Sequence, residues 1–310
     1  AMAAATPKAS HARSARPARR SSWRRRLIVW SALLVGLIGL GVVVRMNADE
    51  WLFMWPSRAE FATPAGHEDV EFTTPDGVRL HGWFVRAFDA APGEVRPCIV
   101  QTHGNAGALP DHAPSATWLA QHGFHVLAFD YRDYGRSQET SGETREDLVT
   151  DARAAIAYAR ARPDVDGERI GVIGFSLGSG LGLAAVVEAP SVRAVVARAG
   201  FDGWKTIANR HAPVLGGLLV RSGLDPADSA AALGTRPLLV IHGDADRIVP
   251  IAHGRAVYEA AKAAGVDAEF VELPGVRHND PVWLDPRFTE PIAAFFRTAL
   301  VDTVEAVPAE

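Results

Sequence analysis

The chain has few of the residues that build disulfide-linked or metal-stapled folds. Its 310 residues include one cysteine, Cys98, and three methionines. A single cysteine excludes an internal disulfide framework and a zinc cluster of several cysteines. The spacings of the P-loop and of G-x-G-x-x-G are also missing, so we expect no nucleotide cofactor. Cys98 lies within an apolar run and is expected to be a small buried side chain.

Neither sign of charge dominates the chain, but the charges are unevenly distributed. The formal net charge is −4, which argues against a nucleic-acid binder, because such a protein needs a basic face. Residues 1–26 nevertheless contain eight Lys and Arg residues and no acid, so the remaining residues carry −12. These first residues are rich in Ala, Arg, Ser and Pro without apolar periodicity, and we expect a disordered basic tail over residues 1–26.

A long apolar run follows the basic tail directly. Residues 27–44 contain no charge, and Ser31 is their only polar side chain. An α-helix of this length is just sufficient to cross the hydrocarbon core of a bilayer. Tryptophans flank the run and could lie at the two membrane interfaces: Trp23, Trp30, Trp51 and Trp55. The pattern predicts a transmembrane signal anchor over residues 27–44.

Residues 27–44 have three other interpretations besides a membrane anchor. A cleaved signal peptide would end in small residues at an A-x-A-like site, and residues 44–49 (V-R-M-N-A-D) offer none. A buried helix of the domain is disfavoured by the eight preceding cations. The paired arginines leave a twin-arginine or organellar-transit signal open. By the positive-inside rule, we expect the N-terminus in the cytoplasm and the catalytic domain outside it.

The rest of the chain alternates between apolar runs typical of strands and stretches typical of helices. Residues 70–72 and 80–85 alternate like a hairpin around a turn at 74–77. Short apolar runs predict buried strands at 98–100, 125–129, 170–173, 192–197, 238–241 and 270–273. Helices are expected at 114–122, 144–162, 177–188, 252–264 and 286–300. This alternation predicts an α/β, doubly wound, mostly parallel sheet.

The domain organisation follows from these patterns. Residues 200–234 interrupt the alternation between two strands and are expected to form a small cap over one end of the sheet. The predicted order along the chain is a tail (1–26), an anchor (27–44), a linker (45–66), one α/β domain (67–302) and a disordered tail (303–310).

The motif G-x-S-x-G occurs where a predicted strand meets a predicted helix. Gly174, Ser176 and Gly178 would place the serine on a sharp turn, where side chains at the two glycine positions would clash with nearby backbone. The alternative is an ordinary turn of Gly and Ser. The strand-turn-helix context favours Ser176 as a nucleophile.

A serine hydroxyl needs a base and an orienting acid to attack a substrate. Asp246 follows the predicted strand at 238–241, and His278 follows the next strand. Both loops open at the carboxyl edge of a parallel sheet, where Ser176 also emerges. Asp244 competes with Asp246 for the role of the acid. A metal site at His242 and these two aspartates is not expected, because a hard cation would need further carboxylates beside them.

Backbone amides are needed to bind the oxyanion that forms when the serine attacks. The amide of Leu177, directly after Ser176, is one candidate. The loop H-G-N at residues 103–105 follows a predicted strand, and the amide of Asn105 is the other candidate. The alternative is a Gly-Asn turn that merely ends the strand.

Taken together, these motifs resemble the α/β-hydrolase superfamily. The resemblance rests on H-G-N at 103–105, D-Y-R-D-Y-G-R-S at 130–137, G-F-S-L-G at 174–178, the loop at 242–250 and His278. More narrowly, the chain resembles HGN-type serine hydrolases, which include membrane-anchored abhydrolase-domain proteins and dienelactone-hydrolase-like esterases. It departs from them at Asp133, where relatives commonly have glycine, which bears on the local turn and on the charge near the pocket.

The resemblance implies a catalytic triad, an oxyanion hole and no cofactor. The triad would be Ser176, Asp246 and His278, and the amides of Asn105 and Leu177 would form the oxyanion hole. The expected function is a serine hydrolase that cleaves a carboxylic ester, or a thioester, through an acyl-enzyme. Two alternatives are an amide or peptide hydrolase with the same triad, and a catalytically silent, membrane-anchored interaction module.

We expect the substrate to contact the cap. Apolar side chains of residues 200–234 would then line the pocket and favour a lipophilic acyl group, unless they form only the core of the cap. These side chains are Phe201, Trp204, Ile207, Val214, Leu215, Leu218 and Leu219.

Overall fold

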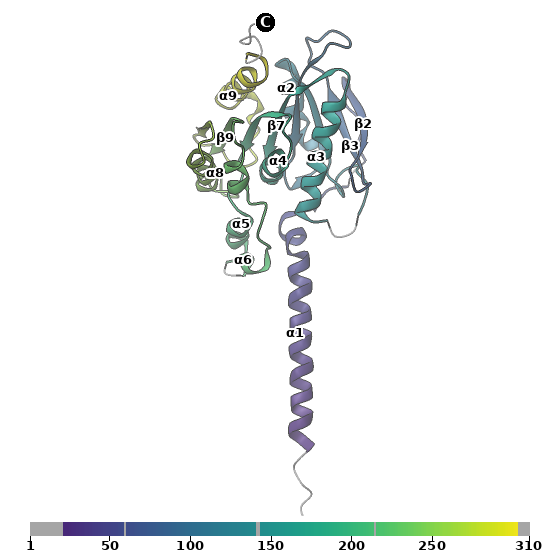
Figure 1. Cartoon of the computed structure of the whole chain (residues 1–310), viewed down its shortest axis with the longest axis vertical. Helices are drawn as coiled ribbons and strands as arrows, with labels where there is room; N and C mark the ends of the chain where they lie inside the picture. The colour runs from purple at the N-terminus through teal and green to yellow at the C-terminus, as the bar shows by residue number, and fades with distance from the viewer. Residues whose placement is uncertain (1–20, 59, 141–142, 214, 303–310) are drawn as a thin grey trace, which may run out of the picture. The chain divides into compact units, whose positions relative to one another are not determined.

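A computed structural model describes the chain except for residues 1–20, 59, 141–142, 214 and 303–310 (Figure 1). The two tails that were predicted to be disordered therefore lie largely or wholly outside the described residues. The chain forms two compact units, residues 1–44 and residues 45–310. Helix α1 (Ser21–Phe53) begins in the first unit and ends in the second.

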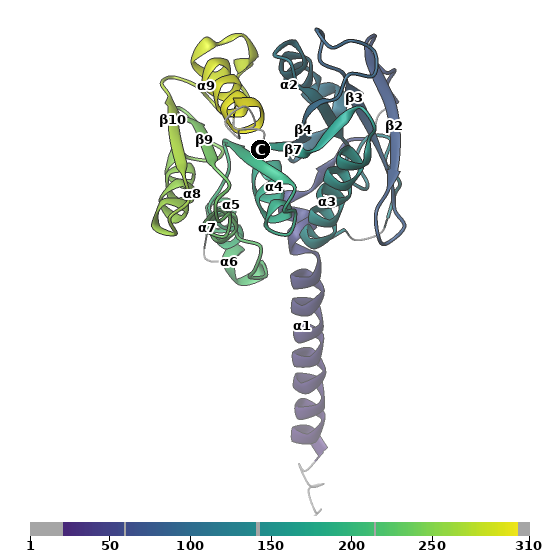
Figure 2. The ribbon, with the colours of Figure 1, turned by 45° about the horizontal axis from the view of Figure 1, so that its top comes forward.

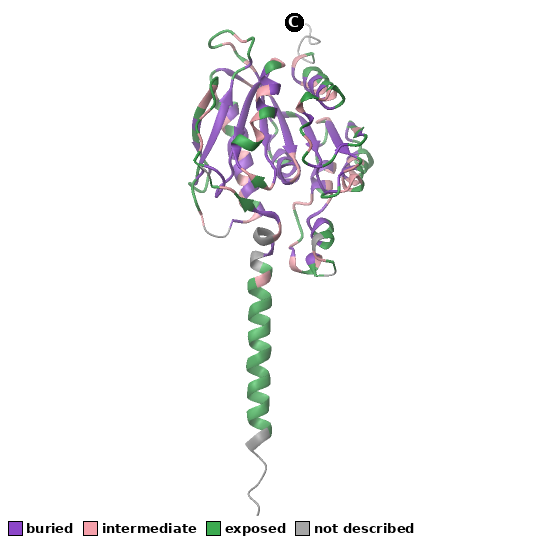
Figure 3. Cartoon of the chain, turned by 180° about the vertical axis from the view of Figure 1, so that it is seen from behind, coloured by how far each residue is buried: buried purple, intermediate pink, exposed green. Residues whose placement is uncertain are grey.

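In its described residues, the first unit is the N-terminal part of α1. The segment Trp23–Arg45 of this helix is long and apolar enough to cross a membrane, and it has no buried side chain in its most apolar window. Figure 3 shows this part of the helix as exposed along its length. Trp23 and Trp30 are 56% and 69% exposed. By length and composition, this N-terminal helix fits either a membrane anchor or a signal sequence.

The second unit begins earlier than the sequence predicted. Residues 45–53, expected to be part of a linker, continue α1, and Phe53 is only 6% exposed. Trp55, expected at a membrane interface, belongs to a short strand, β1 (Trp55–Pro56), which pairs with β5 (Ala106–Gly107). The N-terminal part of this unit is therefore packed against the loop that carries Asn105.

An eight-stranded sheet forms the centre of the second unit and confirms the predicted fold class. The strands lie in the order β10-β9-β8-β7-β4-β6-β3-β2. Only the pairs β2–β3 and β3–β6 are antiparallel. The strand bounds are β2 His67–Thr73, β3 Arg79–Val85, β4 Arg96–Thr102, β6 His125–Phe129, β7 Val165–Phe175, β8 Val192–Arg198, β9 Leu238–Gly243 and β10 Ala268–Leu273.

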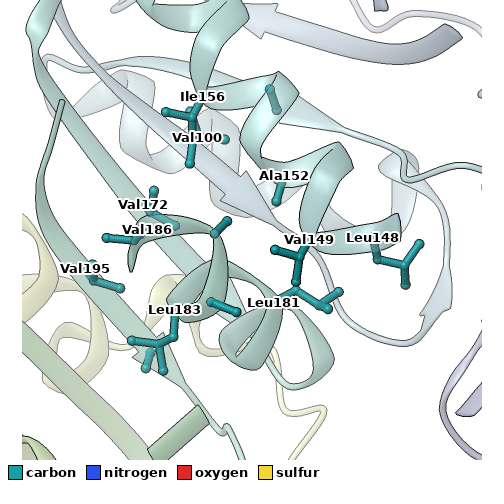
Figure 4. Close-up of a cluster of buried hydrophobic side chains, with 14 of the residues drawn as sticks. Val100, Leu148, Val149, Ala152, Ile156, Val172, Leu181, Leu183, Val186 and Val195 are labelled. Atoms are coloured by element: carbon teal, nitrogen blue, oxygen red, sulfur yellow. The ribbon is translucent and has the colours of Figure 1, made fainter. Parts of the chain in front are cut away.

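Helices cover both faces of this sheet (Figure 2). One face packs against α3 (Arg145–Ala161), α4 (Leu177–Val187) and α8 (Ile251–Ala263), and the other packs against α2 (Leu109–Gln121) and α9 (Pro286–Arg297). Figure 4 shows apolar side chains of α3 and α4, such as Ile156 and Leu181, against strand residues such as Val172. Because both faces are covered, the sequences of the central strands are continuous apolar runs.

Three short helices occupy the segment between β8 and β9. They are α5 (Trp204–His211), α6 (Gly216–Leu219) and α7 (Pro226–Ala231). Trp204 is 1% exposed, and its ring packs edge-on against Phe53 with 5.3 Å between the ring centroids. This segment therefore has an aromatic core that includes the end of α1.

Candidate active site

Ser176 lies on a strained turn between β7 and α4. Its backbone angles are φ 54° and ψ −117°, a conformation that L-residues rarely adopt and that costs about 1–3 kcal/mol. The turn is tight because a side chain at Gly178 would overlap the carbonyl oxygen of Thr102, and one at Gly174 would overlap Gly178. The amide of Ser176 donates to the carbonyl of Arg198 at 2.9 Å, which fixes the turn to β8.

The structure brings the three predicted triad residues into one hydrogen-bonded line. Nε2 of His278 lies 3.0 Å from Oγ of Ser176. Nδ1 of His278 lies 2.6 Å from Oδ2 of Asp246. In the tautomer that suits both bonds, Nδ1–H donates to the carboxylate and Nε2 accepts from the hydroxyl. This arrangement allows the imidazole to take the serine proton while the carboxylate stabilises the resulting cation.

Asp246 is held as a carboxylate by its surroundings. Burial alone would raise the pKa of Asp246, but hydrogen bonds from His242 and His278 outweigh it and hold the pKa below the usual range. Its other oxygen, Oδ1, accepts from the amides of Ile248 and Val249, both at 2.9 Å. Asp246 is therefore charged and fixed in orientation.

The competing carboxylate of Asp244 has a different partner. Its Oδ1 accepts from the amide of Gly275 at 2.6 Å, on the exposed side of the loop. The geometry thus agrees with the preference for Asp246 as the acid. Among the described residues, no group of three or more His, Cys, Asp or Glu side chains comes together in a metal-binding arrangement.

The loop that carries Asn105 is clamped on both sides. The carbonyl of Asn105 accepts from the Tyr134 hydroxyl at 2.8 Å, and the side-chain Oδ1 of Asn105 accepts from the amide of Trp55 at 2.9 Å. These bonds fix the backbone and the side chain of Asn105 at the cavity, whereas the role of its amide in an oxyanion hole stays a prediction. Leu177 is the first residue of α4, so its amide has no acceptor within the helix.

At Asp133 the resemblance implied glycine, and the structure shows how an aspartate is accommodated there. It adopts a left-handed conformation with φ 67°, which explains why glycine suits this position. Its carboxylate accepts from the amide and the hydroxyl of Thr140 at 2.7 and 2.6 Å. The carboxylate is thus hydrogen-bonded within a local turn, and Asp133 does not line the cavity described next.

A cavity of about 670 Å³ opens at Ser176 and His278. Its walls include the aromatic side chains Trp55, Phe175 and Trp283. The sequence did not single out Trp283 or Arg198, which also lines the cavity. The only signal for Arg198 was a cation at the carboxyl end of an apolar strand. Trp55 had been assigned to a membrane interface.

The prediction that residues 200–234 line the pocket is wrong. None of their described side chains belongs to the cavity wall. Phe201, Trp204 and Ile207 are each at most 3% exposed and form part of the core of the domain. Leu215 and Leu218 are 60% and 66% exposed, Leu219 is half-buried, and Val214 lies outside the described residues.

Comparisons with known proteins agree with this geometry. Residues 85–279 match the dienelactone hydrolase family. The protein YfhR of Salmonella typhi is 30% identical over 296 residues, which cover 90% of this chain and 96% of YfhR. The alpha/beta hydrolase domain-containing protein WAV2 of Arabidopsis thaliana is 30% identical and matches 82% of this chain and 89% of WAV2. The esterase Pf2001 of Pyrococcus furiosus superposes with a TM-score of 0.67 at 20% identity and covers 80% of this chain and 98% of its own, which supports the fold.

Proposed function

Because this chain belongs to the dienelactone hydrolase family of the α/β-hydrolase superfamily, we propose that it is a serine hydrolase that cleaves carboxylic esters or thioesters. The observation that carries the proposal is the line of hydrogen bonds from Ser176 through His278 to Asp246, with Ser176 at the cavity. All three groups keep working distances, which a catalytically silent member of the fold would not need.

The first half of the reaction forms an acyl-enzyme. Oγ of Ser176 attacks the ester carbonyl while His278 takes the hydroxyl proton. The amides of Asn105 and Leu177 donate to the oxyanion of the tetrahedral intermediate. His278 then gives its proton to the leaving alcohol. Asp246 remains a carboxylate throughout and stabilises the imidazolium.

The second half releases the acid. A water molecule gives its proton to His278 and attacks the acyl-enzyme, and the oxyanion is again bound by the two amides. When the intermediate collapses, His278 returns the proton to Ser176. The chain's own residues supply every group in this cycle.

The apolar helix suggests where the reaction takes place. We propose that residues 27–44 are an uncleaved signal anchor, with the basic N-terminus in the cytoplasm and the catalytic unit outside it. The exposed apolar surface of α1 supports a membrane anchor, and the eight cations before the run support this orientation.

Fluorophosphonate labelling of isolated membranes tests the proposed nucleophile. We expect the wild-type protein to be labelled, and Ser176→Ala and His278→Ala to lose labelling and esterase activity. Ser179→Ala is the matched control: its hydroxyl lies in the same turn but donates to the carbonyls of Gly174 and Arg198 instead of contacting His278.

Two outcomes would change the proposal. Labelling or esterase activity that survives in Ser176→Ala would remove Ser176 from the role of nucleophile. A folded wild-type protein that is never labelled would favour the silent interaction module. Hydrolysis of peptide or anilide substrates at rates above those of matched esters would favour the amide hydrolase.

A further inference from the structure

The segment that follows α1 connects two loops of the candidate active site. Residues 54–58, here called the bridging segment, come directly after α1 and belong to the second unit. On one side, Trp55 of this segment lies opposite Ala106 in the pairing of β1 with β5. On the other side, Ser57 and Arg58 contact the loop of residues 133–137. No step of the proposed catalytic cycle uses the bridging segment.

The amide of Trp55 donates to Oδ1 of Asn105 at 2.9 Å. Other hydrogen bonds hold the main chain around Asn105. Its carbonyl accepts from the Tyr134 hydroxyl at 2.8 Å. The carbonyl of Gly104, which shares a peptide with the N–H of Asn105, accepts from Nδ1 of His103 at 2.8 Å. The bond from Trp55 thus adds a restraint that comes from outside the loops 103–105 and 130–137.

The bridging segment is itself fixed on both sides of Trp55. Met54 is 3% exposed and belongs to the core of the domain. The carbonyl of Ser57 accepts from the amide of Gly135 at 2.9 Å. Nη1 of Arg58 donates to two backbone carbonyls of the same loop at 3.3 and 3.1 Å. The bond to Asn105 lies in an exposed position, where water competes for the acceptor, so it benefits from a donor that is held in place.

The loop that carries Asn105 needs such restraints because glycines flank it. Gly104 precedes Asn105, and Gly107 adopts a left-handed conformation with φ 89°. Glycine has more backbone freedom than other residues, so peptides beside it reorient more easily. A backbone donor accelerates a reaction most when it already points at the charge that develops in the transition state.

We propose that Trp55 is a positioning residue, whose amide acts through the side chain of Asn105 to keep the Asn105 N–H directed at the oxyanion. The inference rests on the proposed ester hydrolysis and adds the bridging segment to its machinery. The indole of Trp55 has a separate part, because Trp55 lines the cavity. An oxyanion forms only after attack on the carbonyl, so the amide should affect kcat, whereas the indole should affect KM.

Two substitutions at Trp55 separate these parts. Trp55→Ala removes the indole and keeps the amide, whereas Trp55→Pro removes both, because proline has no N–H. With 4-nitrophenyl butyrate as substrate, both variants should have a raised KM. We expect kcat of Trp55→Pro to be about 3- to 10-fold below that of Trp55→Ala, the effect of losing one neutral hydrogen bond.

Asn105→Ala removes the acceptor and leaves the bridging segment unchanged, so it decides the question even if Trp55→Pro fails to fold. It should lower kcat by about 3- to 10-fold and leave KM unchanged. The double variant Trp55→Pro/Asn105→Ala should have the kcat of Trp55→Pro, because the bond is already lost. Asn209→Ala is the control: Oδ1 of Asn209 also accepts from a backbone amide, that of Gly217 at 2.8 Å, and its loss should leave kcat unchanged.

Hydrogen exchange of the full chain in detergent tests the restraint without turnover. The amides of residues 103–107 should exchange faster in Asn105→Ala than in Asn209→Ala and the wild type. Exchange at the same rate in all three proteins, an unchanged kcat in Asn105→Ala, or additive losses in the double variant would overturn the inference. Faster exchange in a protein that cleaves no ester would overturn the proposed function and the catalytic part of Trp55, while supporting the restraint on the loop.

Discussion

At the scale of single residues, two buried histidines near the cavity have different surroundings. His278 has a carboxylate oxygen of Asp246 at 2.6 Å, which would stabilise the imidazolium of the proposed mechanism. His103, at the start of the H-G-N loop, donates from Nδ1 to the carbonyl of Gly104 at 2.8 Å, and its nearest carboxylate oxygen, on Asp130, is 3.7 Å away. Burial, together with His112, lowers the pKa of His103 to about 3.

The lowered pKa of His103 predicts how stability depends on pH. Below pH 6.5, the ordinary pKa of histidine, the unfolded chain binds a proton at His103, whereas the folded protein does so only near pH 3. The folded state therefore loses stability as the pH falls between these values, by about 2 kcal/mol at pH 5. His103→Asn, which keeps a donor near the position of Nδ1, should remove this loss.

Urea unfolding of wild type and His103→Asn at pH 7 and pH 5 measures the effect. The variant is expected to be less stable at pH 7, and the gap should shrink by about 2 kcal/mol at pH 5. A gap of the same size at both pH values would mean that His103 is not kept neutral by burial.

Sequence reasoning was sufficient to predict which side chains meet at the site, because the polar loops follow strands whose carboxyl ends share one edge. The catalytic roles of those side chains stay predictions. Arg198 could not be predicted as part of the cavity wall in the same way. Its burial depends on Phe175, Trp283 and Phe288, which come from three other segments and reach Arg198 only in the folded chain.

At the scale of elements, the turn at Ser176 depends on how closely α4 approaches β4. A side chain at Gly178 would meet the carbonyl oxygens of Thr102 and His103, which belong to the backbone and cannot rotate away. A side chain at Gly180, one half-turn later in the same helix, would meet Cγ of Pro226 at 2.9 Å and Phe201 at 3.4 Å, both side chains.

Alanine substitutions in α4 should therefore have unequal effects. Gly178→Ala should destabilise the protein by about 1–3 kcal/mol because the helix must move away from β4. It should also reduce fluorophosphonate labelling, since Ser176 moves with the helix. Gly180→Ala should cost less than about 1 kcal/mol, because alanine's higher helix propensity offsets the contact.

Urea unfolding of the detergent-solubilised protein, followed by tryptophan fluorescence, compares the two variants. Similar destabilisation by both alanines would show that the approach of α4 to β4 is not what restricts the turn.

The pattern of residues 200–234 predicted a small cap but not the direction of its side chains. Its apolar residues were compatible with a pocket wall and with a core. Trp204 is directed into the core by Phe53 at the end of α1, a contact between residues 151 positions apart in the sequence. The periodicity of a short helix does not indicate which distant residue it will contact. The residues of the cavity wall could therefore not be predicted from the sequence.

At the scale of the whole molecule, the division at residue 44 predicts a separable catalytic unit. The second unit contains the whole sheet and every proposed catalytic group. Arg45 belongs to this unit, where its Nη1 donates to the carbonyl of Leu218 at 2.7 Å, so a deletion should end at residue 44. We expect the full chain in the membrane fraction after carbonate washing, and the chain without residues 1–44 in the soluble fraction.

Fluorophosphonate labelling of both forms completes this test. The truncated protein should be labelled as well as the full chain, because the triad and the cavity lie beyond the deletion. A truncated protein that folds but remains with the membranes would show that residues 1–44 are not the main anchor. If cells that express the full chain yield a protein that lacks residues 1–44, those residues are a cleaved signal.

The orientation of the anchor can be tested because the natural cysteine is a poor target for labelling. Cys98 is fully buried in β4, and burial raises the pKa of its thiol to about 12, so it should not react with a maleimide in the folded protein. An introduced cysteine will then report its own location. Ser222→Cys places one on the exposed surface of the catalytic unit, and Ser10→Cys places one in the basic tail.

A membrane-impermeant maleimide applied to intact cells should label Ser222→Cys and not Ser10→Cys. The physical reason is the cost of moving eight cations out of the cytoplasm against the membrane potential, which is negative on the cytoplasmic side. Lysed cells, in which both cysteines should react, provide the control. Labelling of Ser10→Cys alone in intact cells would reverse the orientation. The substrate of the enzyme would then have to be sought in the cytoplasm.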